Sequence, residues 1–333
     1  MTESEPVDVL RVGMRAVVRH RIEHGVTDAL GYVLAIDADT VTVQTRRGVT
    51  KVARAAVVAA KEVPPPPSRR GAPHLAISME ELERIMVRGW QPVESAELGD
   101  WLLRASAGFT GRANSVLPLG NPGVPLSDAV DRAEKWYDER GLRRVFSLFG
   151  PTGFTIDDDS LGRELLRRGY EPFNNAVVLT ADTTVLAPEV PHLPGARVRL
   201  ESSLSPSWWE AWVAWDARFA PAEEADVPPA VARAVLSGSP EQLFASVEVG
   251  EALIGVARIA FAQDWAGVSA LHVAPDHRRV GVALQIMGAL ADASRTRGIP
   301  SMYLQVARAN SAAWRLYERL GFSIHHEYLY LGQ

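Results

Sequence analysis

A basic turn followed by a glycine separates a strand-like segment from an apolar helix in the C-terminal third of the chain. The stretch reads LHVAPDHRRVGVALQIMGAL over residues 271–290. Pro275 lacks an N–H and therefore ends the strand expected over residues 268–273. Apolar residues follow at helical spacing from Ala283 onward. A helix start leaves its first amides unpaired and carries partial positive charge, so this junction suits a phosphate group.

The residues of this turn could bind a pyrophosphate. Each residue from Arg278 to Gly281 is expected to have a free backbone N–H. Arg278 and Arg279 would add charge-assisted contacts, Gly281 would permit close approach of the backbone, and Ala283 keeps the next turn small. On these residues alone, a solvated basic turn before a helix explains the pattern as well. The turn has neither the Lys-Ser/Thr of a P-loop nor the three-glycine dinucleotide fingerprint.

A second segment favours the functional interpretation. It reads LQVARANSAAWRLYERLGF over residues 304–322 and places Asn310 at a strand-to-helix junction. Together the two segments resemble the GCN5-related N-acetyltransferase (GNAT) superfamily. Its acetyl-CoA loop has the pattern Q/R-x-x-G-x-G/A, and its next strand and helix commonly read N-x-x-A-x-x-L-Y-x-x-x-G-F. The matching residues are Arg278, Gly281 and Ala283 for the first pattern, and Asn310, Ala313, Leu316, Tyr317, Gly321 and Phe322 for the second.

The resemblance implies which residues bind acetyl-CoA. In that superfamily the strand before the loop separates from its neighbour, and its backbone pairs with the pantetheine arm. Leu271, His272 and Val273 would do this here, and amides near them could stabilise the oxyanion formed at the thioester carbonyl. Asn310 would hydrogen-bond the same arm, unless it only caps the helix. The pyrophosphate would lie on Arg278, Arg279, Val280, Gly281, Val282 and Ala283.

The resemblance also implies catalytic roles. Tyr317 would protonate the departing CoA thiolate as a general acid; otherwise it is a core aromatic residue. The general base stays open, because the strand over residues 267–273 carries no carboxylate. The imidazole of His272 is suited to proton transfer near neutral pH, but a packed strand histidine is an equal alternative. Tyr303 and Gln305 could instead hold a water, and we favour a water relay.

Three further segments could border the acceptor site. The stretch GFTGRANS (residues 108–115) could contribute Arg112 or Asn114, or be a structural strand. An acidic loop over residues 218–229 could attract a cationic amine, or be a solvated loop; its carboxylates are Glu223, Glu224 and Asp226. A row of tryptophans shares one helical face and is expected in the core; it consists of Trp208, Trp212 and Trp215.

The sequence predicts no metal site. The chain contains no cysteine, so thiolate zinc sites and a cysteine nucleophile are excluded. His325 and His326 are adjacent on an expected strand and should point to opposite faces, which is poor geometry for a metal. The acidic run at residues 157–159 is explained by helix capping.

The chain divides into four predicted parts. Residues 1–63 read as five short strands of a small SH3-like β-barrel, and the proline-rich residues 64–74 form a linker. Residues 75–190 and 191–333 both alternate strands and helices, which predicts an α/β (α+β) fold with mixed sheets. We interpret them as a degenerate GNAT-like half and a catalytic GNAT domain. The whole chain resembles an actinobacterial group that combines such a barrel with tandem GNAT-like halves.

An internal repeat supports the tandem interpretation. The stretch RRGYEPFNNAVVL (residues 167–179) parallels ERLGFSIHHEYLYL (residues 318–331), and Gly141 corresponds to Gly298. This alignment places NPGVPL at residues 121–126 opposite the basic turn. The first copy has two prolines and no arginine there, so we expect only the second half to bind acetyl-CoA.

The leading hypothesis is an acetyl-CoA-dependent N-acetyltransferase that acts on a primary amine, either a small molecule or a protein lysine, by direct attack in a ternary complex. The alternative is a non-catalytic acyl-CoA-binding sensor or adaptor that recruits a partner through the barrel. The N-terminus has no signal pattern and no apolar run could span a membrane, so we expect a cytoplasmic protein. The net charge of -5 gives no strong nucleic-acid signal, although a slight basic excess leaves a partner surface on the barrel open.

Overall fold

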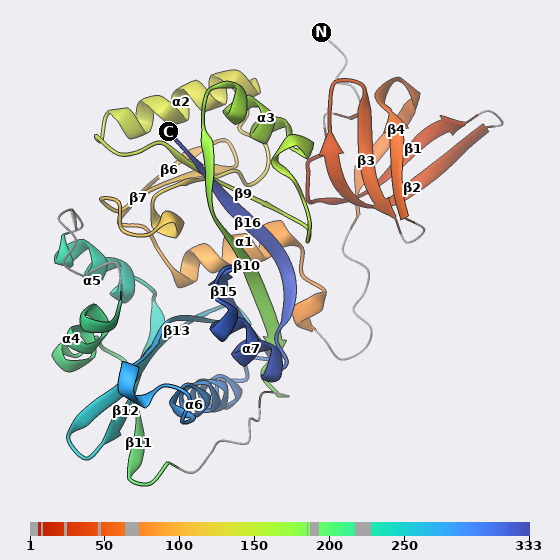
Figure 1. Ribbon diagram of the computed structural model, residues 1–333. Coiled ribbons are helices and arrows are strands. Elements are labelled where there is room, and N and C mark those ends of the chain that lie inside the picture. The colour runs from red at the N-terminus through yellow and green to blue at the C-terminus, as the bar shows by residue number, and fades with distance from the viewer. Residues whose placement is uncertain are drawn as a thin grey trace.

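The computed structural model describes residues 6–7, 9–22, 25–45, 48–63, 73–184, 186, 193–216 and 228–333. An N-terminal sheet of five antiparallel strands has the order β4-β3-β2-β1-β5 (Figure 1). Its strands are β1 (Arg15–Ile22), β2 (Gly25–Ile36), β3 (Thr40–Thr45), β4 (Gly48–Ala53) and β5 (Val57–Glu62). The five predicted strands are thus confirmed. The edge strands β4 and β5 do not pair with each other in the described residues, so closure into a barrel stays a prediction.

The rest of the chain forms one mixed sheet of eleven strands in the order β11-β12-β13-β14-β15-β10-β16-β9-β8-β7-β6. Its strands from the first half are β6 (Glu94–Leu98), β7 (Trp101–Ala105), β8 (Val116–Leu117), β9 (Val145–Gly150) and β10 (Glu171–Asp182). Those from the second half are β11 (Ala196–Glu201), β12 (Glu241–Val249), β13 (Ala252–Ala262), β14 (Trp265–Val273), β15 (Ser301–Ala307) and β16 (Ser323–Gly332). The predicted α/β class is confirmed, with β6 as a strand that the sequence pattern did not predict.

The two halves exchange their last strands. β10, which ends the first half, pairs antiparallel with β15 from Ala176 to Asp182. β16, which ends the chain, pairs antiparallel with β9 from Glu327 to Gly332. β10 and β16 also pair with each other and cross the middle of the molecule side by side (Figure 1). The tandem halves therefore share one continuous sheet.

Within the described residues, seven α-helices flank this sheet. They are α1 (Met79–Gly89), α2 (Leu126–Asp138), α3 (Ser160–Arg167), α4 (Pro206–Trp215), α5 (Pro229–Ser237), α6 (Val282–Thr296) and α7 (Ser311–Arg319). Alternate residues of β13 face opposite sides of the sheet. Val256 packs with the tryptophans of α4 on one side, and Ala257 packs with α6 on the other. Trp208 and Trp212 are buried and Trp215 is partly buried, so the predicted core role of these tryptophans is confirmed.

The predicted repeat is visible in the turns that follow equivalent helices. Gly169 follows α3 with φ +88° and Gly321 follows α7 with φ +83°. Gly141 and Gly298 follow α2 and α6 with φ +61° and +71°. Left-handed backbone after a helix favours glycine because it has no Cβ. The two halves therefore end these helices in the same way.

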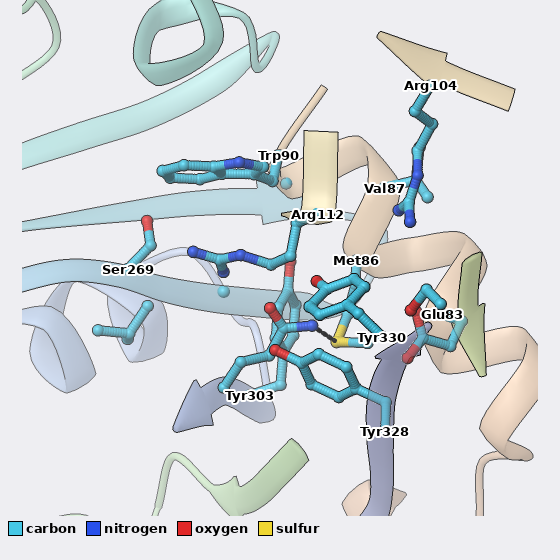
Figure 2. A pocket seen from close by; sticks show the side chains of 15 residues that line it. Glu83, Met86, Val87, Trp90, Arg104, Arg112, Ser269, Tyr303, Tyr328 and Tyr330 are labelled. Atoms are coloured by element: carbon cyan, nitrogen blue, oxygen red, sulfur yellow. Dashed lines mark hydrogen bonds between the residues drawn. The ribbon is translucent and has the colours of Figure 1, made fainter. Parts of the chain in front are cut away.

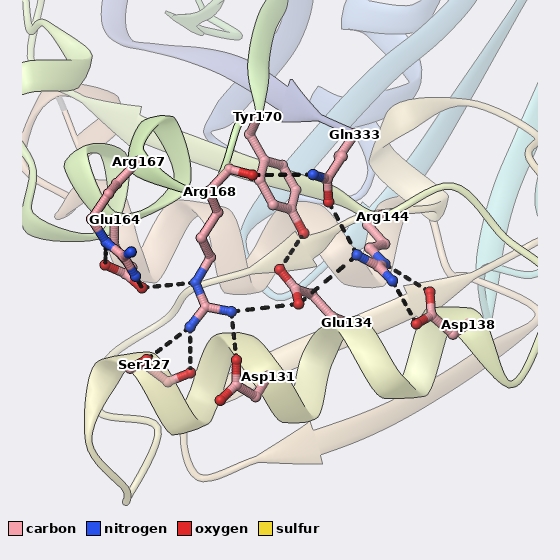
Figure 3. Close-up of polar contacts among 10 residues, drawn as sticks. All are labelled: Ser127, Asp131, Glu134, Asp138, Arg144, Glu164, Arg167, Arg168, Tyr170 and Gln333. Atoms are coloured by element: carbon pink, nitrogen blue, oxygen red, sulfur yellow. Dashed lines mark hydrogen bonds and ion pairs between the residues drawn. The ribbon is translucent and has the colours of Figure 1, made fainter.

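A network of ion pairs anchors the end of the chain in the first half (Figure 3). Arg168, at the end of α3, pairs with Glu164 and with Asp131 on α2. Arg144 pairs with Asp138 and donates to the side-chain oxygen of Gln333. The side-chain amide of Gln333 in turn donates to the Arg168 carbonyl at 3.1 Å. The last residue of the chain thus joins the ends of α2 and α3.

A buried guanidinium joins the halves on the other side of the sheet. Arg258 on β13 is 0% exposed. It donates to the carbonyls of Gly89 (2.8 Å) and Leu236 (2.6 Å), which lie at the ends of α1 and α5. It also donates to the side chains of Ser239 and Gln242. Burial lowers its pKa to about 9, so it remains charged at neutral pH.

We predict that Arg258→Met lowers the free energy of unfolding by about 3 kcal/mol or more, because it leaves several buried acceptors without donors. Chemical denaturation of both proteins measures this. Arg132→Met, which removes an exposed arginine from α2, should change stability by less than about 0.5 kcal/mol. Equal stability of the two variants would show that the Arg258 contacts do not hold the halves together.

Candidate functional site

A cleft of about 1210 Å³ opens where β14 and β15 separate. These parallel strands pair from Trp265 opposite Ser301 to Val268 opposite Leu304, and no further. Beyond that point β14 continues to Val273 along the cleft. Its backbone on this side is therefore available to a ligand. We call this space the donor cleft.

A bulge bends β14 at the point of separation. Ser269 pairs with Arg258 and His272 with Val256, so Ala270 and Leu271 together oppose one residue of β13. Ala270 has φ +53°, a left-handed conformation that is unfavourable for a residue with a Cβ. Bulges of this kind redirect a strand and are frequent beside active sites. Here the bulge turns the end of β14 toward the donor cleft.

The basic turn forms the far end of the donor cleft. A 3₁₀ turn over Pro275–His277 leads to Arg279, with φ +65°, and to Gly281, with φ +101°, which is the N-cap of α6. Among the described residues, no side chain caps the first amides of α6. The expectation that Arg278 has a free N–H was wrong, because its N–H closes the 3₁₀ turn onto the Pro275 carbonyl at 3.4 Å.

The structure brings all the residues predicted to bind acetyl-CoA to this one cleft. Its basic end fits a pyrophosphate, since Arg278 and Arg279 flank an uncapped helix start. Arg278 Nε also donates to the Val273 carbonyl at 3.2 Å. The predicted residues that line the cleft are Leu271, His272, Val273, Arg278, Arg279, Val280, Gly281, Val282, Ala283, Asn310 and Tyr317.

Asn310 and Tyr317 approach the cleft from α7. The side-chain oxygen of Asn310 accepts from Ala313 N at 3.1 Å, so this residue caps the helix. Tyr317 is 8% exposed and packs edge-to-face on Phe322, with ring centroids 5.7 Å apart. Burial raises the pKa of Tyr317 to about 12. Its phenol therefore keeps its proton at neutral pH and can donate it.

His272 has a carboxylate partner that the sequence analysis missed. Its Nε2 lies 3.4 Å from Oδ2 of the buried Asp216, the residue that ends α4. The pair lies beside the donor cleft, where Asp216 can orient the imidazole. Asp216 directly follows the tryptophan-rich helix, and no motif in the sequence connects it with β14.

A second, inner pocket lies between the halves and meets the donor cleft (Figure 2). Its walls include four aromatic side chains, those of Trp90, Tyr303, Tyr328 and Tyr330. The accessible space is about 20 Å³, and roughly 10–15 Å³ is enough for one water molecule. The residues shared with the donor cleft are Arg112, Val268, Ser269 and Gln305. Tyr303 and Gln305, which the sequence suggested could hold a water, both line this pocket.

The inner pocket receives a carboxylate from the first half. Glu83, on α1, is 5% exposed and lines the pocket. Its Oε1 lies 2.9 Å from Nε2 of His326. His326 Nδ1 lies 2.7 Å from Nδ1 of His325, whose Nε2 lies 3.0 Å from the Ile77 carbonyl. Glu83 was missed although a signal existed, since it shares a helical face with the apolar Met79 and Met86.

The expectation that His325 and His326 point to opposite faces was wrong. β10 and β16 shift register here, since Val178 pairs with His326 and Leu179 with Ile324. His325 is therefore an extra, bulged residue, and the two imidazoles meet. Burial and the neighbouring His326 lower the pKa of His325 to about 4, so this ring is neutral at neutral pH.

A third space, which we call the outer cleft, has a volume of about 530 Å³. It adjoins both other spaces at Arg112 and Gln305. Asn114 also lines it but has a structural role. Its Oδ1 accepts from the backbone N–H groups of Ser106 and Gly108, and its Nδ2 donates to the Phe109 carbonyl at 2.7 Å. Of the two candidates from this loop, Arg112 is the one whose side chain forms no hydrogen bond or ion pair with another described residue.

In the described chain, the acidic run at residues 157–159 provides a helix cap and no metal site. Asp159 caps α3 by accepting from Leu161 N and Gly162 N, as capping of the acidic run predicted. Within the described ranges, no group of three or more His, Asp or Glu side chains is arranged to hold a metal ion. The same ranges include no helix with the length and apolar character needed to cross a membrane. Glu223, Glu224 and Asp226 lie outside the described residues.

The first half does not reproduce the donor cleft at the equivalent loop. Pro125 takes the N-cap position of α2. The amide of Asn121 donates to the Asp100 carboxylate at 2.8 Å, so a negative charge already occupies this loop. Leu10 and Arg11 of the N-terminal region border the remaining space of about 260 Å³.

The fold and the donor cleft define a GNAT-type acetyltransferase. The structure is similar to a solved GCN5-related N-acetyltransferase from Kribbella flavida (TM-score 0.55, 17% identity, covering 76% of this chain and 95% of that one). It is also similar to a tandem GNAT protein from the clavulanic acid biosynthesis pathway (TM-score 0.50, 14% identity, 79% and 89% covered). Enzymes of this type take the acetyl group from acetyl-CoA.

The chain belongs to the family described as "Probable histone acetyltransferase Rv0428c C-terminal", which matches residues 78–331. It is 28% identical to the probable histone acetyltransferase Rv0428c of Mycobacterium tuberculosis over 327 residues, which cover 96% of this chain and 95% of that protein. It is 26% identical to the uncharacterized N-acetyltransferase YobR of Bacillus subtilis over 245 residues, covering 74% and 94%. The predicted family and the acetyltransferase class are confirmed.

We predict that calorimetric titration detects one acetyl-CoA site per chain, and none in Gly281→Glu. The substitution adds a side chain at φ +101° and a negative charge at the helix start. The control is Gly250→Glu, which also has a positive φ (+61°) but lies in the exposed turn after β12. Two sites in the wild type, or full binding by Gly281→Glu, would contradict the assignment.

Proposed function

We propose that the protein transfers the acetyl group of acetyl-CoA to a primary amine by direct attack in a ternary complex. The observation that carries this proposal is the meeting of the donor cleft and the inner pocket at Ser269 and Gln305. Tyr317 borders one space and Glu83 the other. A thioester in the donor cleft would thus meet an amine held beside the inner pocket, with a proton donor on the first space and a proton acceptor on the second.

We assign donor binding to residues 191–333 and a scaffold role to residues 75–190, which also form a wall of the acceptor site. The amides after Arg278 and the guanidinium groups of Arg278 and Arg279 would hold the pyrophosphate. The free edge of β14 from Leu271 to Val273 would pair with the pantetheine arm. Amides at the bulge would stabilise negative charge that develops on the thioester oxygen.

The hydrogen-bond chain of Glu83 defines where its protons lie. The Ile77 carbonyl can only accept, so His325 Nε2 carries the proton and His325 Nδ1 accepts from His326 Nδ1. His326 Nε2 and Glu83 then share one further proton. When that proton is on His326, Glu83 is a carboxylate stabilised by an imidazolium, and it can accept a proton from the acceptor ammonium through one water in the inner pocket.

In the proposed reaction, two groups of the protein transfer protons. Glu83 accepts the proton that the ammonium loses, the amine nitrogen forms a bond with the acetyl carbon, and the carbon–sulfur bond breaks. Tyr317 donates its proton to the departing sulfur and recovers one from the new amide nitrogen. The products are the N-acetylated amine and CoA, with one proton released to solvent. His272 lies farther along β14 with Asp216, and we assign it to donor binding.

The non-catalytic alternative has one observation in its favour. The N-terminal sheet exposes several apolar side chains that could recruit a partner: Ile22, Val26, Leu30, Val49 and Val58. The buried Tyr317 and Glu83 beside the junction support the enzyme, since a sensor has no need of a proton donor and acceptor there. The cytoplasmic location remains a prediction from the sequence.

We predict that Tyr317→Phe lowers kcat by about 100-fold, with little change in acetyl-CoA affinity, because it removes only the proton donor. The release of CoA thiol and calorimetric binding measure the two quantities. In the wild type, kcat should not fall between pH 8 and about 10 through this group, because its pKa is raised to about 12. Unchanged kcat in Tyr317→Phe would remove the phenol from the reaction, and Tyr32→Phe is the control.

We predict that Glu83→Gln lowers kcat at neutral pH by at least about 100-fold, because it removes the proton acceptor. The defect should diminish as the pH rises toward the pKa of the acceptor amine, since more of the amine is then already neutral. A pH profile of kcat measures this. Glu81→Gln, on the exposed side of the same helix, should behave as the wild type. A defect that is independent of pH would indicate a structural role for Glu83.

A further inference from the structure

We propose that the acceptor is an amino acid, in which a carboxylate lies close to the reacting amine, and that Arg112 and Arg143 bind its carboxylate in the outer cleft. This inference rests on the proposed acetyl transfer and adds the class of acceptor. The evidence for this acceptor class is the position, the charge and the packing of these two arginines.

The outer cleft is the larger of the two spaces on the acceptor side of the junction. Its volume of about 530 Å³ falls within the range of small-molecule sites. It shares Arg112, Gln305, Tyr328 and Tyr330 with the inner pocket. A small molecule in the outer cleft would therefore lie beside the point where the inner pocket meets the donor cleft.

The charged side chains that line the outer cleft are all positive. Among its described lining residues, Arg112 and Arg143 are the ones charged at neutral pH, and none is Asp or Glu. Neither arginine forms an ion pair with a carboxylate in the part of the chain that the structure describes. Two guanidinium groups without acidic partners favour an anionic ligand and disfavour a polycationic one.

Each guanidinium group is held by stacking on an aromatic ring, which leaves its N–H groups available to a ligand. Arg112 lies over the ring of Trp90, 4.4 Å from its centroid, and Arg143 lies 4.6 Å from that of Phe173. The turn that carries Arg112 is fixed by Asn114 and by Trp90 Nε1, which donates to Thr110 Oγ1 at 3.0 Å. A stacked guanidinium still presents its N–H groups in a planar fork that matches a carboxylate.

The position of Arg112 sets where the carboxylate lies relative to the amine. Arg112 borders the donor cleft, the inner pocket and the outer cleft, and its side chain extends toward Ser269 (Figure 2). A carboxylate bound there would be close to the attacking nitrogen, as in an amino acid. The cation would also favour the neutral form of that amine, which is the nucleophile.

The test compares matched acceptors with the full-length protein. The twenty standard amino acids, their amides, phosphoethanolamine, spermidine and a lysine-rich peptide are each incubated with acetyl-CoA, and release of CoA thiol is measured. We expect at least one amino acid to be acetylated with kcat/KM ten-fold or more above that of its amide. Equal or faster reaction of the amide, or a preference for phosphoethanolamine, spermidine or the peptide, would overturn the inference.

Variants separate acceptor binding from donor binding. Arg143→Met and Arg112→Met should each raise KM for the amino acid ten-fold or more, and Arg143→Met, which does not border the donor cleft, should leave acetyl-CoA affinity unchanged. Each variant should lower kcat/KM at least ten-fold more for the amino acid than for its amide, which lacks the carboxylate. Arg132→Met, outside all three spaces, is the control. An unchanged KM for the amino acid in both cleft variants would overturn the inference.

Failure of the proposed function itself gives a different result. In that case no amine in the panel is acetylated, whether or not acetyl-CoA binds. Acetylation of another amine in the panel, but of no amino acid, would overturn the inference about the acceptor and leave the proposed acetyl transfer intact.

Discussion

The exchange of β10 and β16 is the constraint on which the site depends. Each half completes its part of the sheet with a strand from the other, so the boundary between the halves is a set of backbone hydrogen bonds. The inner pocket lies over this boundary. Its walls come from α1, from the turn that carries Arg112, from β14 and β15, and from the exchanged β16. The proposed acceptor site is therefore built by both halves, whereas the donor cleft is lined almost entirely by the second.

This division explains why the residues that line the donor cleft could be predicted from the sequence, whereas most of those that line the inner pocket could not. The donor cleft is built from two short contiguous segments, and its chemistry depends on backbone amides, a glycine and the adjacent arginines. Arg278, Gly281, Asn310 and Tyr317 therefore carry a pattern that survives in a single sequence. Helices and strands were predictable for the same reason, since their apolar periodicity is local.

The acceptor side depends on contacts between residues far apart in the chain. Glu83 meets His326 only because β16 crosses into the first half. Arg112 and Arg143 line one cleft although they lie in separate loops, and Asp216 meets His272 only through the packing of α4. The pairing of the two histidines depends on a register shift between exchanged strands. Strand alternation alone predicts that the two histidines face opposite sides of the sheet. The bulge that brings them together leaves no local signal in the sequence.

The anchoring of Gln333 has a consequence for the biosynthesis of the protein. Domains commonly fold in order as they leave the ribosome. Here the first half lacks the strand between β9 and β10 until the last ten residues of the sheet have been made. The hydrogen bonds of Gln333 with Arg144 and Arg168 also form only after β16 has been made. Of the described strands, the one at the centre of the sheet is therefore synthesised last, and β9 and β10 keep unpaired edges until residues 323–332 have left the ribosome.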